Sequence, residues 1–346
     1  MDAWHGLHDE RWDAAQAALA ESGLTDGLPV IPPTPQRIEA AFKTCGVDPA
    51  AIIATLPPAF AEVTWHDVAV NAVMAGCAPA HLPVVSAAIA AMAAPEFNLL
   101  GIATTTGSAT VCTIVNGPIA RTLGMNSGTN ALGPGNRANA TIGRAIRLVL
   151  QNAGGAKVGE MDMATLGQPG KYTFCFAENE AESPWPPLHV ERGFDGGAST
   201  VTVFGVSGTI EVVDSESATP EALAQTFAQS MLIAGNVGSG GLLGGGEPLI
   251  VMPPEHAQVF AGGGRSKTDA KALIFERALL SIDRLSPAQR ERTVAGGAKD
   301  GQLRIAREAG DVVIVVAGGV GRKAAYVPTW SGATRAVTRE IFFATG

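Results

Sequence analysis

Residues 98–125 read NLLGIATTTGSATVCTIVNGPIARTLGM, and residues 235–264 read GNVGSGGLLGGGEPLIVMPPEHAQVFAGGG. Each stretch combines a Gly-rich turn, an apolar segment with strand character, a Pro-containing turn and the start of a helix. Their central parts align as TIVNGPIA and LIVMPPEHA. The pattern predicts an internal duplication, and therefore an α/β or α+β fold with two similar lobes.

The segments around the two stretches favour the same repeat. An Ala-rich helix is expected before each stretch, at 84–93 and 220–233, and a basic helix after each, at 136–151 and 268–280. Strand–turn–helix units also resemble one another in unrelated proteins, so similarity without duplication is the alternative.

The remaining segments set the expected boundaries of the lobes. Residues 310–327, GDVVIVVAGGVGRKAAYV, read as a third, shortened copy of the unit, and residues 199–213 alternate as strands do. We therefore expect an N-terminal lobe over residues 1–155 with the first repeat. A C-terminal lobe over residues 156–346 is expected to hold the second repeat and the shortened third one.

Composition argues against several kinds of partner. The 346 residues are 46% hydrophobic and 16% charged, which is typical of a chain with a large buried core. A formal net charge of −8 and the lack of a basic stripe argue against nucleic acid and against an anionic membrane surface. The first residues show no signal-peptide pattern, and the apolar segment Leu82–Met92 is too short to span a bilayer. We therefore expect a cytoplasmic protein.

Cysteine usage and short motifs bear on cofactors. The four cysteines lie far apart without a CxxC motif, which fits free thiols in a reducing compartment. No phosphate-binding G-x-x-x-x-G-K-[ST] loop occurs, and no GxGxxG with a later acidic residue stands out, so no nucleotide is indicated. No H-E-x-x-H motif points to zinc, and the sequence leaves the cofactor and the presence of a metal unknown.

Residues 131–147, ALGPGNRANATIGRAIR, join a Gly-rich turn to a polar helix start. Asn136 is the expected N-cap, and Arg137 and Arg144 lie about two turns apart on one face, with Asn139 nearby. Free N–H groups and the helix dipole favour an anion at such a start, which predicts a site for a carboxylate or phosphate. The alternative is that both arginines pair with the protein's own carboxylates.

Cys77 follows a predicted helix end at Gly76, in the stretch NAVMAGCAPAHLPVV (71–85). A thiol at such a junction is a candidate nucleophile or redox group, with His81 or His66 as its base. The alternative is a buried structural thiol, which is the common fate of a lone cysteine.

The Pro-rich loop 177–193 gathers carboxylates, an imidazole and a guanidinium in one short stretch: Glu178, Glu180, His189, Glu191 and Arg192. Loops with this mixture are frequent in binding and catalytic sites, so we assign function to His189, Glu191 and Arg192. The acidic side chains also have the spacing of an oxygen-rich metal site. The alternative is a solvated acidic loop.

A second polar stretch, PPEHAQVFAGGGRSKTDAK, starts at residue 253. In the alignment of the two repeats, Glu255 and His256 replace an apolar pair at a helix start, which suits proton transfer. Ser266 and Lys267 follow a glycine run, and a Ser–Lys pair is one arrangement that supports hydrolysis. The alternative is a capping serine beside a surface lysine.

Five stretches together resemble a bacterial family of mostly uncharacterised proteins: DGLPVIPPTPQR (26–37), NAVMAGCAPAHLPVV (71–85), TIVNGPIA (113–120), ALGPGNRANATIGRAIR (131–147) and GQPGKYTFCFAENEAESPWPPLHVERGF (167–194). The resemblance covers about residues 20–345. The family is associated with thiol- or selenol-containing proteins that carry a Gly-Ser-Cys motif and are compared with the glycine and betaine reductases. This chain has no Gly-Ser-Cys motif, so the resemblance implies that a partner polypeptide carries the reactive thiol or selenol.

The repeated unit also invites comparison with cyanuric acid hydrolase and barbiturase. In those enzymes three similar parts each contribute a serine and a lysine to one site. Their serine motifs are not visible in this sequence, so the comparison stays an analogy.

The favoured hypothesis is an enzyme, a lyase or reductase component, that cleaves a carbon–heteroatom bond in a small polar or anionic molecule. Cys77 is its expected nucleophile, and Glu255, His256 and His189 are its candidate proton carriers. The substrate is expected to bind Asn136, Arg137 and Asn139 near Asn116, with Arg137 and Lys267 facing one ligand from opposite lobes. The alternatives are an amide or cyclic-amide hydrolase that uses Cys77 or Lys267, and a non-catalytic subunit for a thiol- or selenol-bearing partner. A homo-oligomer is compatible with each hypothesis.

Overall fold

Two four-stranded mixed sheets form the centre of this α/β protein. The first sheet contains β3 (Thr110–Asn116), β4 (Cys175–Ala177), β5 (Thr200–Val206) and β12 (Val337–Glu340). The second sheet contains β6 (Ile210–Val213), β7 (Leu249–Met252), β10 (Val313–Val316) and β11 (Lys323–Val327). The computed structural model describes residues 10–43, 45–238, 241–295 and 300–342.

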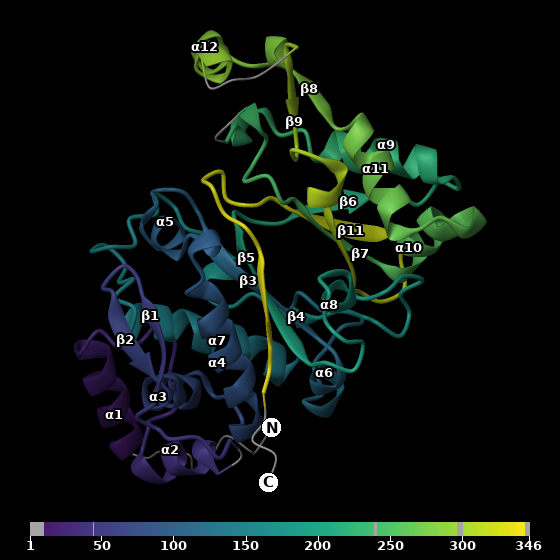
Figure 1. Ribbon diagram of the computed structural model, residues 1–346. Helices are drawn as coiled ribbons and strands as arrows, with labels where there is room; N and C mark the ends of the chain where they lie inside the picture. The colour runs from purple at the N-terminus through teal and green to yellow at the C-terminus, as the bar shows by residue number, and fades with distance from the viewer. Residues whose placement is uncertain (1–9, 44, 239–240, 296–299, 343–346) are drawn as a thin grey trace.

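The two sheets share one topology (Figure 1). β3 pairs in parallel with β4 and antiparallel with β5, which in turn pairs antiparallel with β12. β7 likewise pairs in parallel with β10 and antiparallel with β11, which pairs antiparallel with β6. The chain runs from β5 into β6 of the other sheet and returns from β11 to β12. The strands that follow β5 and β11 along the chain, β6 and β12, therefore each form an edge of the other sheet.

The shared topology corrects the residue-by-residue alignment of the repeats. TIVNGPIA and LIVMPPEHA set Ile114 against Ile250. Ile114 packs between the two sheets, whereas Ile250 packs on the opposite side of its own sheet, under helices. Neighbouring residues of a strand face opposite sides, so a shift of one residue exchanges the faces. Duplication of the sequence stays a prediction, although the repeated architecture is present.

Two further boundary expectations need correction. Residues 310–327 supply β10 and β11, so this segment completes the second sheet and forms no third unit. The expected boundary between residues 155 and 156 falls inside the first lobe, because β4 and β5 follow it and both belong to the first sheet. β12 also belongs there, so the first lobe includes a piece of chain near residue 340.

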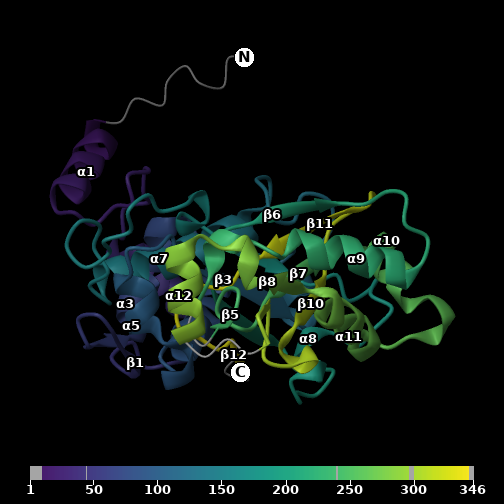
Figure 2. The same ribbon diagram turned by 90° about the horizontal axis from the view of Figure 1, so that it is seen from above.

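Helices cover the outer face of each sheet and give four layers, helix–sheet–sheet–helix (Figures 1 and 2). The first lobe uses α3 (Trp65–Ala75), α4 (Leu82–Met92) and α7 (Arg137–Asn152). The second uses α9 (Pro220–Ser230), α10 (Pro254–Ala261) and α11 (Lys267–Arg277). The inner faces pack on each other through side chains such as Ile114 and Phe204 from one sheet and Val251 and Val315 from the other.

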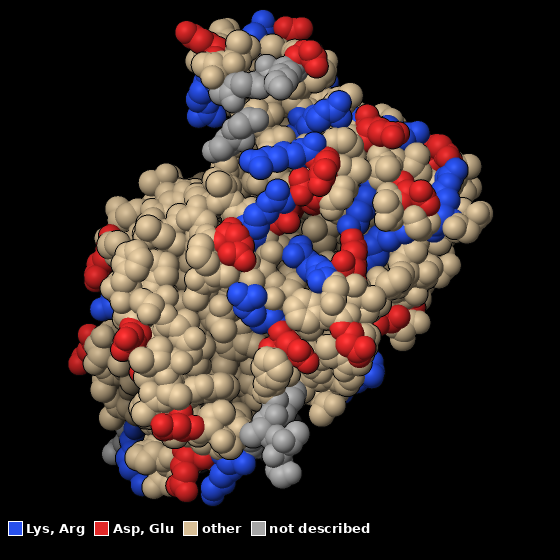
Figure 3. All heavy atoms as spheres, in the orientation of Figure 1, with Lys and Arg blue, Asp and Glu red and all other residues tan. Residues whose placement is uncertain are grey.

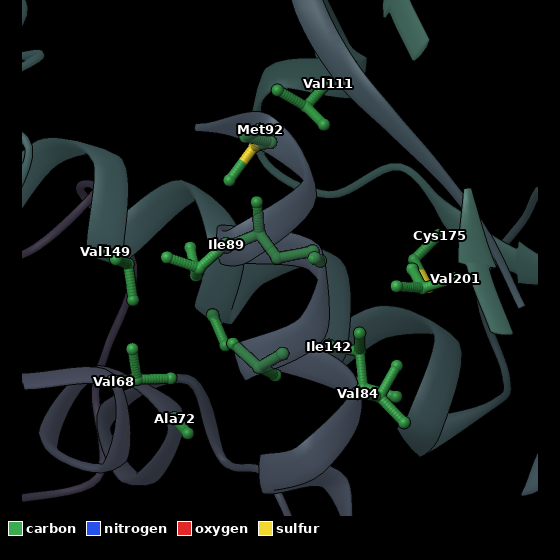
Figure 4. Close-up of a cluster of buried hydrophobic side chains, with 14 of the residues drawn as sticks. Val68, Ala72, Val84, Ile89, Met92, Val111, Ile142, Val149, Cys175 and Val201 are labelled. Carbon is green, nitrogen blue, oxygen red and sulfur yellow. The ribbon is translucent and has the colours of Figure 1, made fainter. Parts of the chain in front are cut away.

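The outer core of the first lobe lies between its sheet and its helices (Figure 4). Val68 of α3, Ile89 of α4 and Ile142 of α7 are fully buried in it, and Val201 of β5 closes it from the sheet side. Burial of one such aliphatic side chain stabilises the fold by about 1.5–3 kcal/mol. These helices are therefore held mainly by packing.

Local sequence signals set the ends of the helices near the candidate sites. Thr64 and Asp67 form the capping box that starts α3. Gly76 ends α3 in the left-handed region with φ 89°, which a residue without a Cβ adopts at low cost. Asn136 caps α7 by accepting a hydrogen bond from the backbone N–H of Asn139 at 3.0 Å.

The other elements surround these layers. They are α1 (Glu10–Glu21), α2 (Pro35–Phe42), the hairpin β1 (Ile52–Leu56) and β2 (Ala61–Thr64), α5 (Leu99–Thr104), α6 (Pro118–Thr122), α8 (Leu188–Glu191), β8 (Leu279–Ser281), α12 (Pro287–Ala295) and β9 (Gln302–Arg304).

Across the described ranges, no single helix has the length and apolar composition needed to cross a bilayer. The pair Pro79–Met92 and Pro95–Thr104, bent by 78°, meets that test only when the two are taken together.

Candidate active site at the carboxyl ends of the parallel strands

The parallel strands of the two sheets end close to each other. The backbone N–H of Asn179, just beyond β4, donates to the carbonyl of Val316, the last residue of β10, at 2.7 Å. The N–H of Gly318 then donates to the carbonyl of Ser127 at 2.8 Å. Ligands of open α/β sheets bind beyond the carboxyl ends of strands, so this junction is where a site is expected.

Two strand ends of the first lobe bring an amide and two carboxylates together. Asn116 ends β3, and its Nδ2 donates to Glu178 Oε2 at 2.6 Å and to Glu180 Oε1 at 3.1 Å. The backbone N–H of Gly117 also donates to Glu180 Oε1, at 2.7 Å, and that of Leu188 donates to Glu178 Oε2 at 2.8 Å. The parallel pairing of β3 and β4 therefore fixes both carboxylates.

The short helix α8 places His189 beside these carboxylates. Its ring is fully buried, and its Nδ1 lies 3.9 Å from Glu180 Oε1. Its Nε2 lies 3.4 Å from the carbonyl oxygen of Gly196, which can only accept. In the neutral ring this contact assigns the proton to Nε2 and leaves a lone pair on Nδ1.

Helix α11 of the second lobe adds two buried ammonium groups. Lys267 Nζ lies 3.2 Å from Glu191 Oε2, and Lys271 Nζ contacts Glu191 Oε1. Burial raises the pKa of the Glu191 carboxyl, but the charges of Lys267 and Lys271 outweigh it and hold that pKa below its ordinary value. Glu191 is thus ionised at neutral pH, and a second positive charge stays available beside it.

We call this set the interlobe cluster: Asn116, Glu178, Glu180, His189, Glu191, Lys267 and Lys271. Four of its buried atoms, Asn116 Oδ1, Glu178 Oε1, His189 Nδ1 and Lys267 Nζ, have no hydrogen-bond partner among the described residues, although Lys267 Nζ forms the ion pair with Glu191. Each buried unpaired polar group costs about 1–3 kcal/mol, so such groups are rare in purely structural positions. Unpaired buried atoms also occur elsewhere in the described residues, for example His256 Nδ1, but only here do several of them lie in one cluster of charged and polar side chains.

Glu178 has the electrostatic character of a proton carrier. Burial raises the pKa of its carboxyl above the ordinary value of 4.5, and the nearby Lys267 charge and the hydrogen bonds from Leu188 and Asn116 oppose this only in part. A carboxyl whose pKa is raised in this way moves towards the pH range where it can both donate and accept a proton.

The cluster has a route to solvent. The side chains of Glu180 and Glu191 are 20% and 31% exposed, whereas those of His189 and Lys267 are 0% and 7% exposed. In Figure 3 the charged side chains crowd over the second lobe and along the line where the lobes meet, and the neighbouring face of the first lobe is mostly uncharged. Glu180 and Glu191 are therefore partly exposed members of the cluster, whereas His189 and Lys267 are buried.

Glu255 and His256, the predicted proton carriers of the second repeat, lie outside the cluster. His256 is buried against Phe227, with ring centroids 5.5 Å apart, and its Nε2 donates to the carbonyl of Asp214 at 2.8 Å. Burial lowers the pKa of His256, so the ring is neutral in the core. Glu255 Oε1 accepts a hydrogen bond from the N–H of Gly321 at 3.1 Å and holds that turn.

Cys77 also lies apart from the cluster, at the end of α3. Its Sγ is 3.3 Å from the carbonyl oxygen of Thr141. Burial raises the pKa of this thiol to about 12, and burial lowers the pKa of His81 to about 4, assisted by the Arg137 charge. Both groups are therefore neutral at pH 7, and this geometry favours a structural thiol over a thiolate.

The predicted anion site at the start of α7 makes mostly internal contacts. Asn139 is buried, and its Nδ2 donates to the carbonyls of Asn126 and Ala131 at 2.8 and 3.2 Å. Arg144 forms a two-pronged contact with Asp26, with both nitrogen–oxygen distances 2.8 Å. Arg144 therefore follows the alternative reading, a pair with the protein's own carboxylate.

Arg137 and Arg192 bind backbone carbonyls. Arg137 donates from Nε and Nη2 to the carbonyl of Gly76, at 3.0 and 2.9 Å. Arg192 donates to the carbonyl of Ala336 at 3.1 Å and stacks over the ring of Phe204. The structure thus places Arg137 with Cys77 and Lys267 with Glu191, in two different sets of contacts.

Ser266 has the role of a cap. Its Oγ accepts from the N–H of Asp269 at 3.2 Å and donates to the Asp269 carboxylate at 2.7 Å, which forms the capping box of α11. This hydroxyl is therefore engaged in starting the helix, and the Ser–Lys arrangement loses its nucleophile.

The sequence pattern points to Asn116, His189, Glu191 and Lys267 but gives no catalytic role to Glu178, Glu180 or Lys271. Glu178 comes just after β4 and Asn116 ends β3, which is a usable signal, since the two parallel strands end at one edge. Lys271 lies one turn after Lys267, which resembles a solvated helix face more than a buried one.

Neither a metal-binding group nor a similar protein assigns a function to this cluster. The residues that the structure describes contain no group of three or more His, Cys, Asp or Glu side chains placed to hold one metal ion. No protein-family model, no curated protein and no solved structure matches this chain.

Proposed function

We propose that this chain is an enzyme that cleaves a carbon–heteroatom bond in a small anionic molecule by acid–base catalysis at the interlobe cluster. The observation that carries the proposal is a set of buried polar atoms without hydrogen-bond partners among the described residues: Asn116 Oδ1 and Glu178 Oε1 at the carboxyl ends of β3 and β4, and His189 Nδ1 on α8 beside them. Such atoms cost stability unless a ligand pairs with them.

Each group has a role that its surroundings support. Lys267 and Lys271 hold the anionic part of the substrate, because they are buried cations with one shared carboxylate. His189 Nδ1 removes a proton from the carbon next to the bond that breaks, or from an attacking water. Glu178, whose pKa is raised by burial, supplies a proton to the departing heteroatom in its protonated form. Asn116 fixes Glu178 by its hydrogen bond.

The thiol-dependent form of the reaction has less support within this chain. The neutral thiol of Cys77 is bound to the carbonyl of Thr141 and lies outside the cluster. A thiol or selenol, where the reaction needs one, then comes from a partner polypeptide, as the resemblance to the Gly-Ser-Cys-associated family implies.

The test is turnover of small carboxylates that bear amine, amide or thioether groups, followed by mass spectrometry with and without dithiothreitol. We expect turnover without the thiol, lost by about 100-fold or more in Glu178→Gln. Glu182→Gln is the matched control, because Glu182 is an exposed carboxylate of the same loop. Full activity in Glu178→Gln contradicts the proposal.

Cys77→Ala separates the thiol mechanism from the acid–base mechanism. Acid–base catalysis at the interlobe cluster predicts activity close to that of the wild type, since the thiol touches none of the cluster residues. Loss of activity in Cys77→Ala with unchanged thermal stability would instead support the thiol mechanism. Turnover only after addition of a Cys- or Sec-bearing partner would support the subunit hypothesis.

A further inference from the structure

A groove in the first lobe lies outside the interlobe cluster. It encloses about 260 Å³ between α2, the end of α3 and the start of α7. Its floor is apolar and includes Ile31, Ala40, Ala72, Val73 and Leu82. Cys77 also lines it and, as a neutral thiol, adds a small apolar surface. The groove therefore has the size and lining for the aliphatic part of a small molecule.

Two exposed arginines line the same groove. Arg37 donates to the carbonyl of Pro32 at 2.9 Å, and Arg137 donates to the carbonyl of Gly76. Within the described ranges neither forms an ion pair with a carboxylate, in contrast to Arg144, which is paired with Asp26. Their positive charges are therefore not compensated by the part of the chain that the structure describes.

Arg137 presents part of its guanidinium to the groove. It is the first residue of α7, and its side chain reaches the carbonyl of Gly76 at the end of α3. The contact with Gly76 uses Nε and one terminal nitrogen of Arg137, and the other terminal nitrogen has no partner among the described residues. A carboxylate can bind such a free guanidinium edge.

From this combination we propose that the groove binds a small aliphatic monocarboxylate. The carboxylate binds Arg37 and Arg137, and the hydrocarbon chain lies on Ala40, Ala72 and Leu82 beside the Cys77 thiol. The neutral floor excludes a second charge deep in the groove, which limits the ligand to one charged end. This site is separate from the interlobe cluster and does not depend on the function proposed for it.

Isothermal titration calorimetry with sodium hexanoate tests the proposal, with hexan-1-ol as the uncharged comparison. We expect hexanoate to bind and hexan-1-ol to bind at least tenfold more weakly, because only the carboxylate engages the arginines. The double variant Arg37→Met/Arg137→Met should weaken hexanoate binding at least tenfold. Arg121→Met removes an exposed arginine of the same lobe and should leave binding unchanged.

A steric variant keeps the test independent of the arginines. Ala40 is half-buried on α2, and Ala40→Phe should fill the groove and abolish hexanoate binding while circular dichroism confirms a folded protein. Glu178→Gln should bind hexanoate as the wild type does, which separates this site from the interlobe cluster. The proposal is overturned by equal binding of hexanoate to Ala40→Phe, by equal binding of hexan-1-ol, or by no binding to the wild type up to about 10 mM.

Discussion

The carboxyl ends of the two parallel strand pairs share a backbone arrangement and differ in chemistry. β3 and β4 lead into Asn116 and Glu178, whose buried polar atoms are only partly paired. β7 and β10 end at Met252 and Val316, which are fully buried apolar side chains. One topology therefore offers two equivalent positions, and only one of them carries polar and titratable side chains.

The difference also predicts opposite contributions to stability. We call the carboxyl ends of β3 and β4 the first end, and those of β7 and β10 the second end. Apolar side chains at the second end stabilise the fold by burial, whereas the unpaired groups at the first end each cost about 1–3 kcal/mol of folding free energy. A site that is less stable than its surroundings is typical of catalytic positions, because the groups are arranged for a ligand.

The largest expected effect concerns Glu178, at the carboxyl ends of β3 and β4. Glu178→Gln should lower turnover by about 100-fold or more, since it removes the proton carrier and keeps the shape. Met252→Leu, the matched change at the other end, should leave turnover unchanged and alter the free energy of unfolding by less than about 1.5 kcal/mol. Similar losses of turnover in both variants would remove the distinction between the two ends.

The next prediction concerns β7, whose side chains are expected to contribute to stability and not to turnover. Ile250→Ala should lower the free energy of unfolding by about 2–5 kcal/mol, because Ile250 is fully buried in β7. Turnover per folded molecule should not change. Urea unfolding measures the first quantity, and Val213→Ala, at an exposed position of β6, serves as the control with a change within about 0.5 kcal/mol. A selective loss of turnover in Ile250→Ala would place catalytic function at the second end.

A smaller effect sharpens the role of the buried lysines. Lys267→Met should raise KM about tenfold, which corresponds to the loss of one favourable charge contact, and should change kcat less. Steady-state kinetics measures both constants. Lys323→Met removes the same charge from an exposed position of β11 and should leave KM as it is. An unchanged KM in Lys267→Met would show that the substrate does not contact this ammonium group.

The sequence predicts the fold class, but it does not predict which strands pair in each sheet. The apolar runs of β3 and β7, the Thr64 cap and the helix stop at Gly76 are local signals, so each can be read from neighbouring residues. The exchange of β6 and β12 between the sheets depends on contacts between distant segments. No short pattern in the sequence records those contacts, so the sequence does not show that β4, β5 and β12, which follow residue 155, belong to the first sheet.

The candidate site was predicted in part for the same reason. His189 and Lys267 are residue types that carry chemistry, which the sequence shows, but their proximity depends on how the lobes pack. Arg137 and Lys267 both lie at the start of a basic helix, and this similarity suggested one shared ligand. Arg137 instead contacts Gly76 within the first lobe, so the similarity of the two helices does not bring them to one site.

The most direct test of the interlobe cluster is the stability of Glu178→Gln as a function of pH. Burial raises the pKa of the folded Glu178 carboxyl, so its contribution to stability is fully present below pH 4.5 and is lost as the pH rises through the raised pKa. Gln is neutral at every pH and escapes this loss.

Urea unfolding of the wild type, Glu178→Gln and the control Glu182→Gln from about pH 4 to pH 8 measures the difference in free energy of unfolding. The difference is predicted to favour Gln increasingly as the pH rises and then to level off, while Glu182→Gln shows no such trend. A Glu178→Gln variant that is less stable than the wild type at pH 7, by an amount independent of pH, would contradict the assignment of Glu178 as a strained, buried proton carrier.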